Sequence, residues 1–197
     1  MLIDMEPHDK RLRIIQAAVQ VIAQKGFHRA KMEEIARKAD VGKGTLYEYF
    51  PSKEQLFIEM VKLGNKFYHS QLMEHIKYVE GCAEKLRAVA YLHMIFFSEH
   101  RDMAQVMMQE YMQFGPLVRE EFARFYEQEI RVIQEIISKG IEEGSLRSLE
   151  ARKTAWLFYG AVHTISCKFI YEEDKSDLEK LAEEVTEIFL KGIVHEN

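Results

Sequence analysis

The chain has 197 residues, 47% apolar and 30% charged, with three prolines, which excludes a disordered chain and leaves room for a small module plus one larger domain. Its net charge is −5, but residues 1–55 carry +2 and residues 56–197 carry −7, so only the first quarter is electrostatically suited to DNA phosphates. Cys82 and Cys167 lack the paired spacing of a zinc site, and the longest uncharged run, of 14 residues, is too short to span a membrane.

Apolar residues recur at spacings of three and four along nearly the whole chain, which predicts helices and no strand. The first helix, Lys10 to Lys25, has Leu12, Ile15 and Val19 on one face, and Gly26 ends it. Further helices are expected at Lys31 to Ala39, Lys43 to Tyr49, Ser52 to about Val79, Ala83 to Glu99, Arg101 to Met112, Leu117 to Gly140 or Gly144, Leu149 to Tyr171 and Ser176 to Gly192. The sequence therefore predicts an all-α fold of about nine helices.

Two of these helices begin with the same capping pattern. Ser52 is followed three residues later by Gln55, and Ser176 by Glu179. In this pattern the hydroxyl of the first residue accepts a hydrogen bond from a free N–H of the first helical turn. We therefore expect Ser52 and Ser176 to cap the fourth and the last helix.

The second and third helices have the features of a helix-turn-helix. Such a motif needs a small residue where the helices cross, a tight turn, and an apolar anchor in the second helix. Ala36 is the small residue, Asp40 lies at the turn, and Leu46 is the anchor. Aspartate tolerates left-handed backbone angles better than most residues, so Asp40 can occupy the position that glycine would fill most easily.

A longer pattern surrounds this motif. It comprises Gly26-Phe27, Ile35-Ala36, Ala39-Asp40-Val41, Gly44-Thr45-Leu46-Tyr47, Tyr49-Phe50 and Ser52-Lys53-Glu54 with Leu56. From Lys10 to Leu56, without gaps, the chain resembles the amino-terminal domain of tetracycline-repressor-type (TetR) regulators. The family usually has threonine or serine at position 30, glycine at 40 and serine at 42, where this chain has Ala30, Asp40 and Gly42.

The resemblance implies both a domain organisation and a function. A DNA-binding domain of residues 8–68, with its helix-turn-helix at 31–50, would precede a helical ligand-binding and dimerisation domain of residues 69–197. The family acts by default as repressors, so the implied function is a DNA-binding transcriptional regulator. It would bind a pseudo-palindromic operator as a homodimer, with half-sites about one duplex turn (~34 Å) or somewhat more apart, and a small hydrophobic effector would release it.

The resemblance also implies which residues contact DNA. They are Lys31, Gly42, Lys43, Gly44, Thr45, Tyr47, Glu48, Tyr49 and Lys53. Lys43 and Thr45 are expected at base edges, because lysine can donate to guanine and a threonine methyl can pack on thymine. We expect Glu48 either to point away from the phosphates or to accept from a cytosine amino group.

The other residues of this set would fix position rather than sequence. Tyr47 and Tyr49 would donate their hydroxyls to phosphates, and Lys31 and Lys53 would add positive charge at the starts of two helices. Gly44 would allow the backbone to approach the DNA closely.

The eighth predicted helix carries two apolar stripes, so it must bury two faces. One face can pack within the subunit and the other across a two-fold axis. We expect the dimer interface to comprise Ala151, Ala155, Phe158, Val162 and Ile165 of this helix, with Leu181, Val185, Ile188 and Phe189 of the last one. The alternative is that both faces are buried within one large monomer.

Aromatic and methionine side chains are concentrated in the middle helices, as an adaptable apolar cavity would require. The candidates for effector binding are Tyr91, Met94, Phe97, Met107, Met108, Tyr111, Phe122, Phe125, Tyr126, Trp156 and His163. Such stripes are also typical of an ordinary core, and it is the family resemblance that favours a cavity. A fatty-acyl or aromatic effector fits, with His163 or a tyrosine orienting its polar end.

Two other classes of function, an enzyme and a carrier, require different residues. An enzyme is not expected, since no histidine has glutamate three positions before it and no HExxH, GxSxG or phosphate-binding glycine loop is present. No cofactor is expected either. A small-molecule or lipid carrier without DNA binding would keep the apolar cavity but would not need Lys43, Thr45 and Lys53. The first six residues lack the basic start of a secretory signal, so we expect a cytoplasmic protein.

Overall fold

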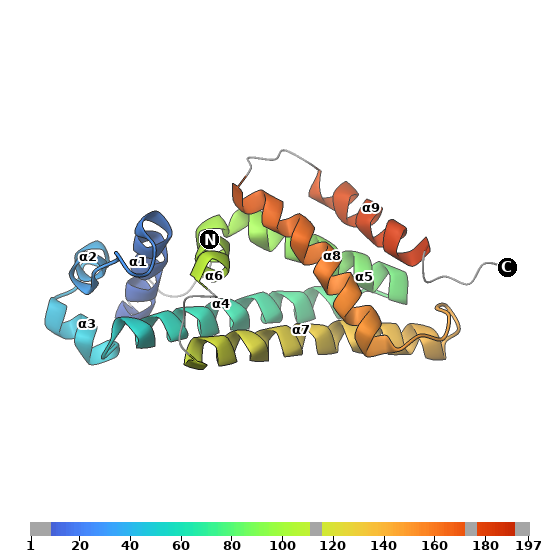
Figure 1. Ribbon diagram of the computed structural model, residues 1–197, viewed down its shortest axis with the longest axis horizontal. Helices are drawn as coiled ribbons and strands as arrows, with labels where there is room; N and C mark the ends of the chain where they lie inside the picture. Colours follow the sequence, from blue (N-terminus) through green and yellow to red (C-terminus); the bar gives the residue numbers. More distant parts are fainter. Residues whose placement is uncertain (1–8, 111–115, 172–176, 192–197) are drawn as a thin grey trace. The chain divides into compact units, whose positions relative to one another are not determined.

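The computed structural model describes residues 9–110, 116–171 and 177–191. Over these ranges it consists of nine α-helices without a strand (Figure 1). They are α1 (Lys10–Lys25), α2 (Met32–Lys38), α3 (Lys43–Tyr49), α4 (Lys53–Ile76), α5 (Cys82–Glu99), α6 (Arg101–Glu110), α7 (Pro116–Glu142), α8 (Ala151–Tyr171) and α9 (Leu178–Lys191). The prediction of an all-α fold is confirmed. None of the helices in these ranges has the length and apolar character needed to cross a bilayer.

The chain divides into two compact units. The first contains the residues up to Phe67 together with His100–Arg124, and the second contains Tyr68–Glu99 and the residues from Phe125 onward. The domain boundary predicted after residue 68 lies next to the first break, but the return of a later segment to the first unit was not predicted. That segment returns because α6 packs against α1, and a contact between helices so distant in sequence leaves no local pattern.

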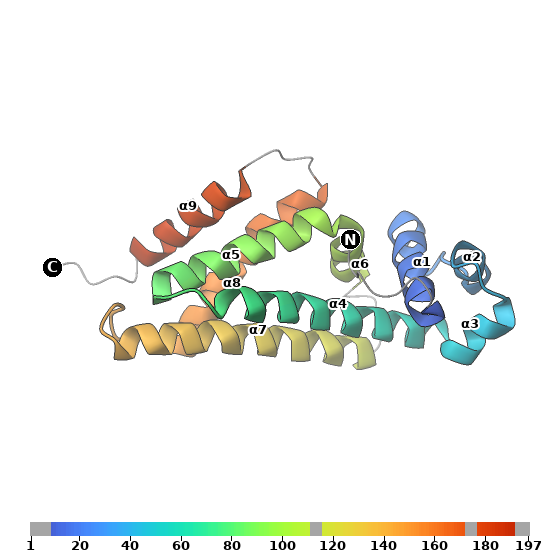
Figure 2. The same ribbon diagram turned by 180° about the vertical axis from the view of Figure 1, so that it is seen from behind.

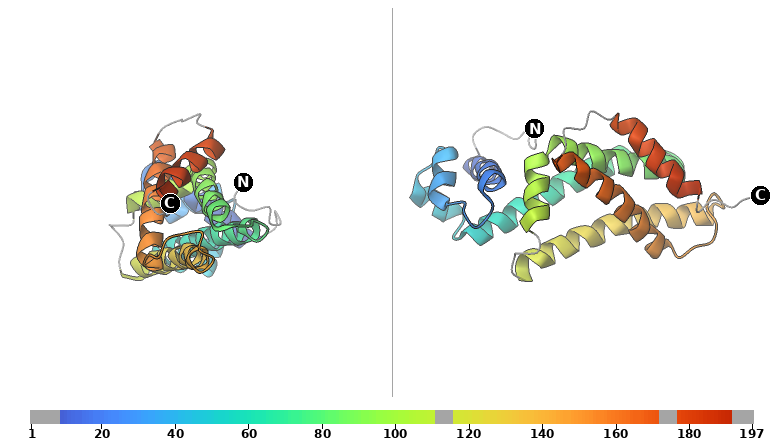
Figure 3. Two further views of the ribbon diagram at one scale, coloured as in Figure 1. Left: turned by 90° about the vertical axis from the view of Figure 1, so that its right-hand side faces the viewer. Right: turned by 45° about the horizontal axis from the view of Figure 1, so that its top comes forward.

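In the first unit, capping at both ends determines the bounds of α1, and a buried apolar face packs it into the core. The Asp9 carboxylate accepts a hydrogen bond of 2.8 Å from the Arg11 N–H, and Gly26 ends the helix with a φ of 78°. Leu12, Ile15 and Ile22 are buried on one side. Against this helix lies α2, which also packs on α3 (Figure 3).

The turn between α2 and α3 closes around Asp40. Its φ is 53°, in the left-handed region, as the sequence predicts for this position. The Val41 N–H donates to the Ala36 carbonyl at 3.0 Å and the Asp40 N–H donates to the Arg37 carbonyl, so the last carbonyls of α2 are satisfied. Leu46 anchors α3 in the core of the unit. The helix-turn-helix geometry thus follows from a turn that tolerates one left-handed residue.

The observed N-terminal cap is the predicted residue at α4 and a different residue at α9. The Ser52 hydroxyl accepts from the Gln55 N–H at 3.1 Å, as expected for the start of α4. At the start of α9 the Asp177 carboxylate accepts from the N–H groups of Glu179 and Lys180. Ser176, the predicted cap, lies outside the described residues, and Asp177 already satisfies the first free N–H groups of this helix.

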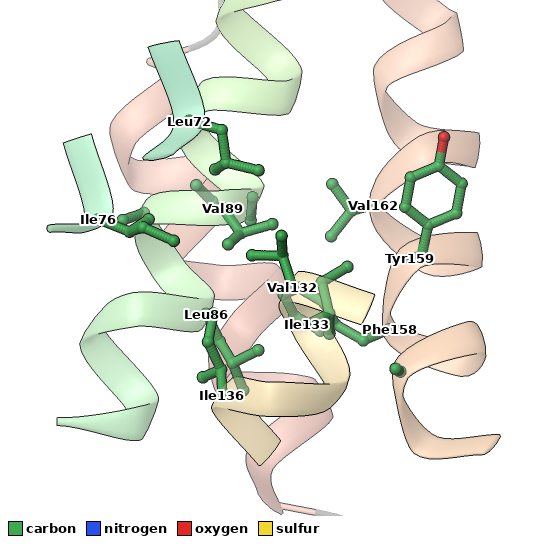
Figure 4. Close-up of a cluster of buried hydrophobic side chains, with 14 of the residues drawn as sticks. Leu72, Ile76, Leu86, Val89, Val132, Ile133, Ile136, Phe158, Tyr159 and Val162 are labelled. Carbon is green, nitrogen blue, oxygen red and sulfur yellow. The ribbon is translucent and has the colours of Figure 1, made fainter. Parts of the chain in front are cut away.

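In the second unit, α5 is central and packs on both α8 and α9 (Figures 1 and 2). The core also takes in the end of α4 and most of α7. Figure 4 shows part of it, with Val162 of α8 pointing towards the aliphatic side chains of α4, α5 and α7. This core holds the helices on which the candidate effector residues lie.

The predicted dimer residues on α8 require a correction. Ala155, Phe158 and Val162 are fully buried within the subunit, and Phe158 packs edge-on against Phe189 at 5.0 Å between ring centroids. Val185 is buried as well, and Ala151, Ile165 and Leu181 are partly buried against the same core. Ala155, Phe158, Val162 and Val185 thus fill the interior of one protomer and cannot also meet a partner, whereas Ala151, Ile165 and Leu181 keep part of their surface exposed. Both faces of α8 are apolar in sequence, and the stripe assigned to the partner is the one that faces inward.

The outward face of this region is apolar at several positions. Leu157 is 70% exposed and Trp156 is 44% exposed on α8, and Ile188 is 74% exposed on α9. Gly160 and Ala161 continue the exposed face of α8 one turn further on. Of the predicted interface residues, Ile188 is therefore the one that lies fully at the surface.

Candidate functional site

The surface of α3 brings together the residues predicted to contact DNA. Lys43, Tyr47 and Tyr49 are exposed, as are Gly42, Gly44 and Glu48, and Thr45 is half-buried. Beneath them Leu46 and Phe50 are buried in the first unit. Lys31 is exposed at the start of α2. The structure thus presents hydroxyl, ammonium and backbone groups on a helix whose apolar side is anchored.

Lys43 is paired within the protein. Its ammonium lies 2.6 Å from a carboxylate oxygen of Glu33, in the first turn of α2, and 5.9 Å from the centroid of the Tyr47 ring. The hydrogen bond to Glu33 raises the pKa of Lys43, and the same bond lowers the pKa of Glu33. Both side chains are exposed, so other charged groups can compete for this pair.

Lys53 has a different role from the predicted one. Its ammonium donates to the carbonyls of Phe27 at 2.7 Å, Ala30 at 3.0 Å and His28 at 3.2 Å, and it lies over the Phe27 ring. An ammonium has three N–H donors, so none is left for a phosphate. Lys53 therefore closes the loop before α2, where Ala30 offers no capping hydroxyl.

The fold does not require the two glycines at the start of α3, Gly42 at its N-cap and Gly44 in its first turn. Gly42 has a φ of −65°, which any residue can adopt. A Cβ added at Gly44 would meet nothing within 4 Å, and one at Gly42 would only touch the Thr45 hydroxyl at 3.9 Å. Larger residues would therefore fit at both positions in the free protein.

The residues predicted to bind an effector are divided by the structure. Tyr91, Met94, Phe97, Phe125, Tyr126 and His163 lie in the second unit, within or against its core. Phe122 is buried in the first unit, and Trp156 is at the surface. Met107 and Met108 belong to α6, in the first unit, and their side chains, like Tyr111, lie outside the described residues. Helical spacing alone does not distinguish these locations.

A chain of buried polar side chains runs through the aromatic core of the second unit. The Tyr68 hydroxyl lies 2.9 Å from His93 Nδ1, and His93 Nε2 lies 3.2 Å from His163 Nδ1. Burial lowers the pKa of His93 to about 3 and also lowers that of His163. The two imidazoles are therefore neutral at physiological pH. Three helices, α4, α5 and α8, supply one member each.

Aromatic rings enclose this chain. His163 stacks on Tyr159 with ring centroids 5.4 Å apart and an interplanar angle of 13°, and it meets Phe97 and Tyr126 edge-on. The Tyr159 hydroxyl is buried and has no hydrogen-bond partner among the described residues. In Figure 4 it points away from the aliphatic side chains of the core. Neither Tyr68 nor Tyr159 is among the residues predicted to bind an effector, although Tyr159 lies one helical turn before His163.

A second buried pair lies in the same unit. Glu129 of α7 is 1% exposed, and its carboxylate lies 3.1 Å from His69 Nδ1. Burial raises the pKa of Glu129, and Glu129 in turn contributes to the raised pKa values of Tyr68 and Tyr159. For both tyrosines burial is the larger cause, and the charge of Glu129 adds to it.

The second unit also has a surface pocket of about 210 Å³ between α4, α5 and α7. Its lining includes the apolar Ile76, Val132 and Ile136 and the basic Lys85 and Lys139. None of the residues predicted to bind an effector lines it. In the ranges that the structure describes, no group of three or more histidine, cysteine or acidic side chains is arranged to hold a metal ion.

Comparisons with known proteins identify the two parts of the chain separately. Residues 14–60 match the model of bacterial regulatory proteins of the tetR family, and residues 61–192 match the C-terminal region of YsiA-like proteins. Together the two matches cover nearly the whole chain.

Individual relatives agree over the same length. The fatty acid metabolism regulator protein of Bacillus subtilis is 28% identical over 185 residues, which cover 93% of this chain and 95% of that protein. The crystal structure of the transcriptional regulator FadR from Bacillus subtilis in complex with stearoyl-CoA has a TM-score of 0.83 at 28% identity, covering 93% of this chain and 99% of that one. FadR from Bacillus halodurans, at 24% identity, has the same TM-score over 94% of this chain and 97% of its own, which supports the fold.

The family matches, the full-length relatives and the exposed recognition helix agree with the resemblance predicted from the sequence. The chain belongs to the tetR family of bacterial regulatory proteins and is a DNA-binding transcriptional regulator with a YsiA-like C-terminal region.

Proposed function

We propose that the protein is a non-enzymatic cytoplasmic repressor that binds a pseudo-palindromic operator as a homodimer and leaves it when a long-chain acyl-CoA binds. The observation that carries the DNA-binding part is the surface of α3, where Gly42 and Gly44 have room for larger side chains. Glycine at both positions is explained if the backbone approaches DNA closely.

The exposed side chains of α3 fit the two tasks of such a helix. Lys43 and Thr45 read base edges in the major groove, and Tyr47 and Tyr49 donate to phosphates. Lys31 adds charge at the start of α2. In the free protein Lys43 is held by Glu33, so binding a base requires Lys43 to exchange or share that partner.

The dimer uses the outward face of α8 and α9. Trp156, Leu157 and Ile188 are large apolar side chains exposed on two neighbouring helices. A second copy that buries them would remove this apolar surface from water. A two-fold dimer would also bring two recognition helices to successive major grooves.

The effector class follows from the relatives. A FadR structure 28% identical to this chain holds stearoyl-CoA, and a relative of the same identity is named a regulator of fatty acid metabolism. The candidate residues Met94, Phe97 and Tyr126 pack into the core or its aromatic cluster, so an entering acyl chain has to displace side chains. Such repacking gives the ligand different affinities for two conformations, which is what release from DNA requires.

The experiment that tests the DNA-binding part is selection of bound sequences from random duplexes, followed by affinity measurements at several salt concentrations. We expect a palindromic consensus and an affinity that falls steeply with salt. Lys43→Ala should relax the preference at one base pair per half-site, with a cost of about 1 to 3 kcal/mol at that pair. Tyr47→Phe should weaken binding to all sequences alike.

Absent or salt-insensitive binding to any duplex would instead favour a carrier of small molecules built on the same fold. Glu54→Gln serves as the control for a charge change, because Glu54 is exposed at the start of α4 and no role at the DNA is assigned to it.

A further inference from the structure

The buried polar chain of the second unit fixes where its protons lie. A neutral imidazole has one N–H. The Tyr68 side chain is buried, and among the described residues its hydroxyl forms a hydrogen bond with His93. If His93 donated to Tyr68, the phenolic hydrogen would be buried without an acceptor, which is costly. Tyr68 therefore donates to His93 Nδ1.

The remaining protons follow from that first bond. His93 carries its hydrogen on Nε2 and donates it to His163 Nδ1, across the 3.2 Å contact. His163 in turn must carry its hydrogen on Nε2, because its Nδ1 is an acceptor. Within the described residues this Nε2–H has no hydrogen-bond partner, so the chain ends on an unused donor.

A second unused group lies beside it. The Tyr159 hydroxyl is buried and unpartnered, and its ring stacks on that of His163, one helical turn along α8. Natural proteins rarely leave a buried hydroxyl such as that of Tyr159 without a partner, whereas His163 is only partly buried. The two side chains present an N–H and an O–H from the same face of one helix.

The surroundings restrict what these donors can bind. Phe97 and Tyr126 enclose His163 edge-on, and His93 lies against its Nδ1 as a neutral imidazole. No positive charge is among these neighbours, so a carboxylate would lose its hydration without gaining an opposite charge. An uncharged oxygen acceptor meets no such penalty.

We infer that His163 and Tyr159 form the site that binds the carbonyl oxygen of an uncharged acyl group, the thioester in the case of an acyl-CoA, with Tyr68 and His93 as positioning residues. This inference rests on the proposed effector and names the part of the ligand that is recognised. Such a site would bind an acyl thioester in preference to a hydrocarbon chain of the same length that lacks the carbonyl oxygen.

The test compares two ligands that differ at one oxygen. Stearoyl-CoA has the thioester carbonyl, and S-octadecyl-CoA is the thioether that lacks it. By calorimetry we expect the wild-type protein to bind the thioester about 10- to 100-fold more tightly, the range expected for losing two hydrogen bonds to buried donors. Tyr159→Phe and His163→Phe should each reduce this ratio severalfold, mainly by weakening the thioester.

Thr186→Val is the matched control, since the Thr186 hydroxyl on α9 is also buried and unpartnered among the described residues, and its loss should leave the ratio unchanged. Equal binding of both ligands by the wild type, or an equal loss for both in Tyr159→Phe, would overturn the inference and leave the effector proposal intact. If the wild type binds neither ligand, the effector proposal itself fails.

The positioning role has an independent readout. In the free protein at pH 7, nitrogen NMR of the histidine rings should show the proton of His163 on Nε2. Tyr68→Phe, which removes the first donor of the chain, should change the tautomer populations of His93 and His163. A proton on Nδ1 of His163 in the wild type would contradict the assignment whatever the ligand.

Discussion

Replacing Leu157 by glutamate is expected to separate the dimer into monomers and to weaken operator binding by on the order of 100-fold or more. Leu157 is 70% exposed on α8, where the proposed two-fold contact would bury it. A carboxylate there would lose its water in each subunit and meet its own copy or an apolar partner. A monomer reads one half-site, so it loses the gain that comes from linking two recognition helices.

Sedimentation and fluorescence anisotropy with labelled operator measure the two effects. Tyr78→Glu is the matched control, because Tyr78 is 74% exposed in the turn after α4, and the same change there should leave both unchanged. The folded state of Leu157→Glu should be retained, since the replaced side chain is at the surface. A dimer that persists in Leu157→Glu with full operator affinity would show that the interface lies elsewhere.

Lowering the pH from 7 to 5 is expected to reduce the free energy of unfolding through His93 by about 2 kcal/mol. The pKa of His93 in the folded protein is about 3, below the usual 6.5, because burial disfavours its charged form. Below pH 6.5 the unfolded chain therefore binds more protons than the folded one. The contribution of His93 is fully present above pH 6.5 and is lost as the pH falls towards 3.

Other groups in the same core titrate as well. The pKa of His163 is also lowered, so His163 acts in the same direction as His93. The pKa of Glu129 is raised, so its contribution runs the opposite way: it is present at low pH and is lost as the pH rises. The effect of His93 is therefore isolated by comparing the wild type with His93→Gln.

Denaturant unfolding at pH 7, 6 and 5 provides the measurement. His93→Gln should be less stable than the wild type at pH 7, since it disturbs two buried hydrogen bonds, but its stability should depend less on pH. Tyr68→Phe is the control, because it removes one bond of the same chain and leaves His93 able to titrate. Identical pH dependence in the wild type and His93→Gln would mean that His93 is not held neutral.

The helix-turn-helix could be predicted from sequence because its determinants are local. Ala36, Asp40 and Leu46 lie within 11 consecutive residues, and each has a steric reason to be where it is. The left-handed turn at Asp40 followed directly from residue type. The contacts of Lys53 could not be predicted in this way, because its three carbonyl partners come from a loop more than 20 residues earlier in the chain.

The second unit was less predictable for two physical reasons. Both stripes of α8 are apolar, and periodicity shows that a face is buried without saying against what, so Phe158 and Val162 were assigned to the partner instead of the core. The hydrogen bonds of the chain Tyr68, His93 and His163 join residues that are 25 and 70 positions apart in the sequence. Such contacts depend on how the helices pack, which no spacing in the sequence encodes.

The most direct test of the proposed function is a titration of the complex between the purified dimer and its selected operator with stearoyl-CoA, followed by fluorescence anisotropy. We expect stoichiometric amounts of the acyl-CoA to release the DNA, while coenzyme A alone leaves the complex intact. An operator complex that stays bound at saturating stearoyl-CoA would contradict regulation by a long-chain acyl-CoA.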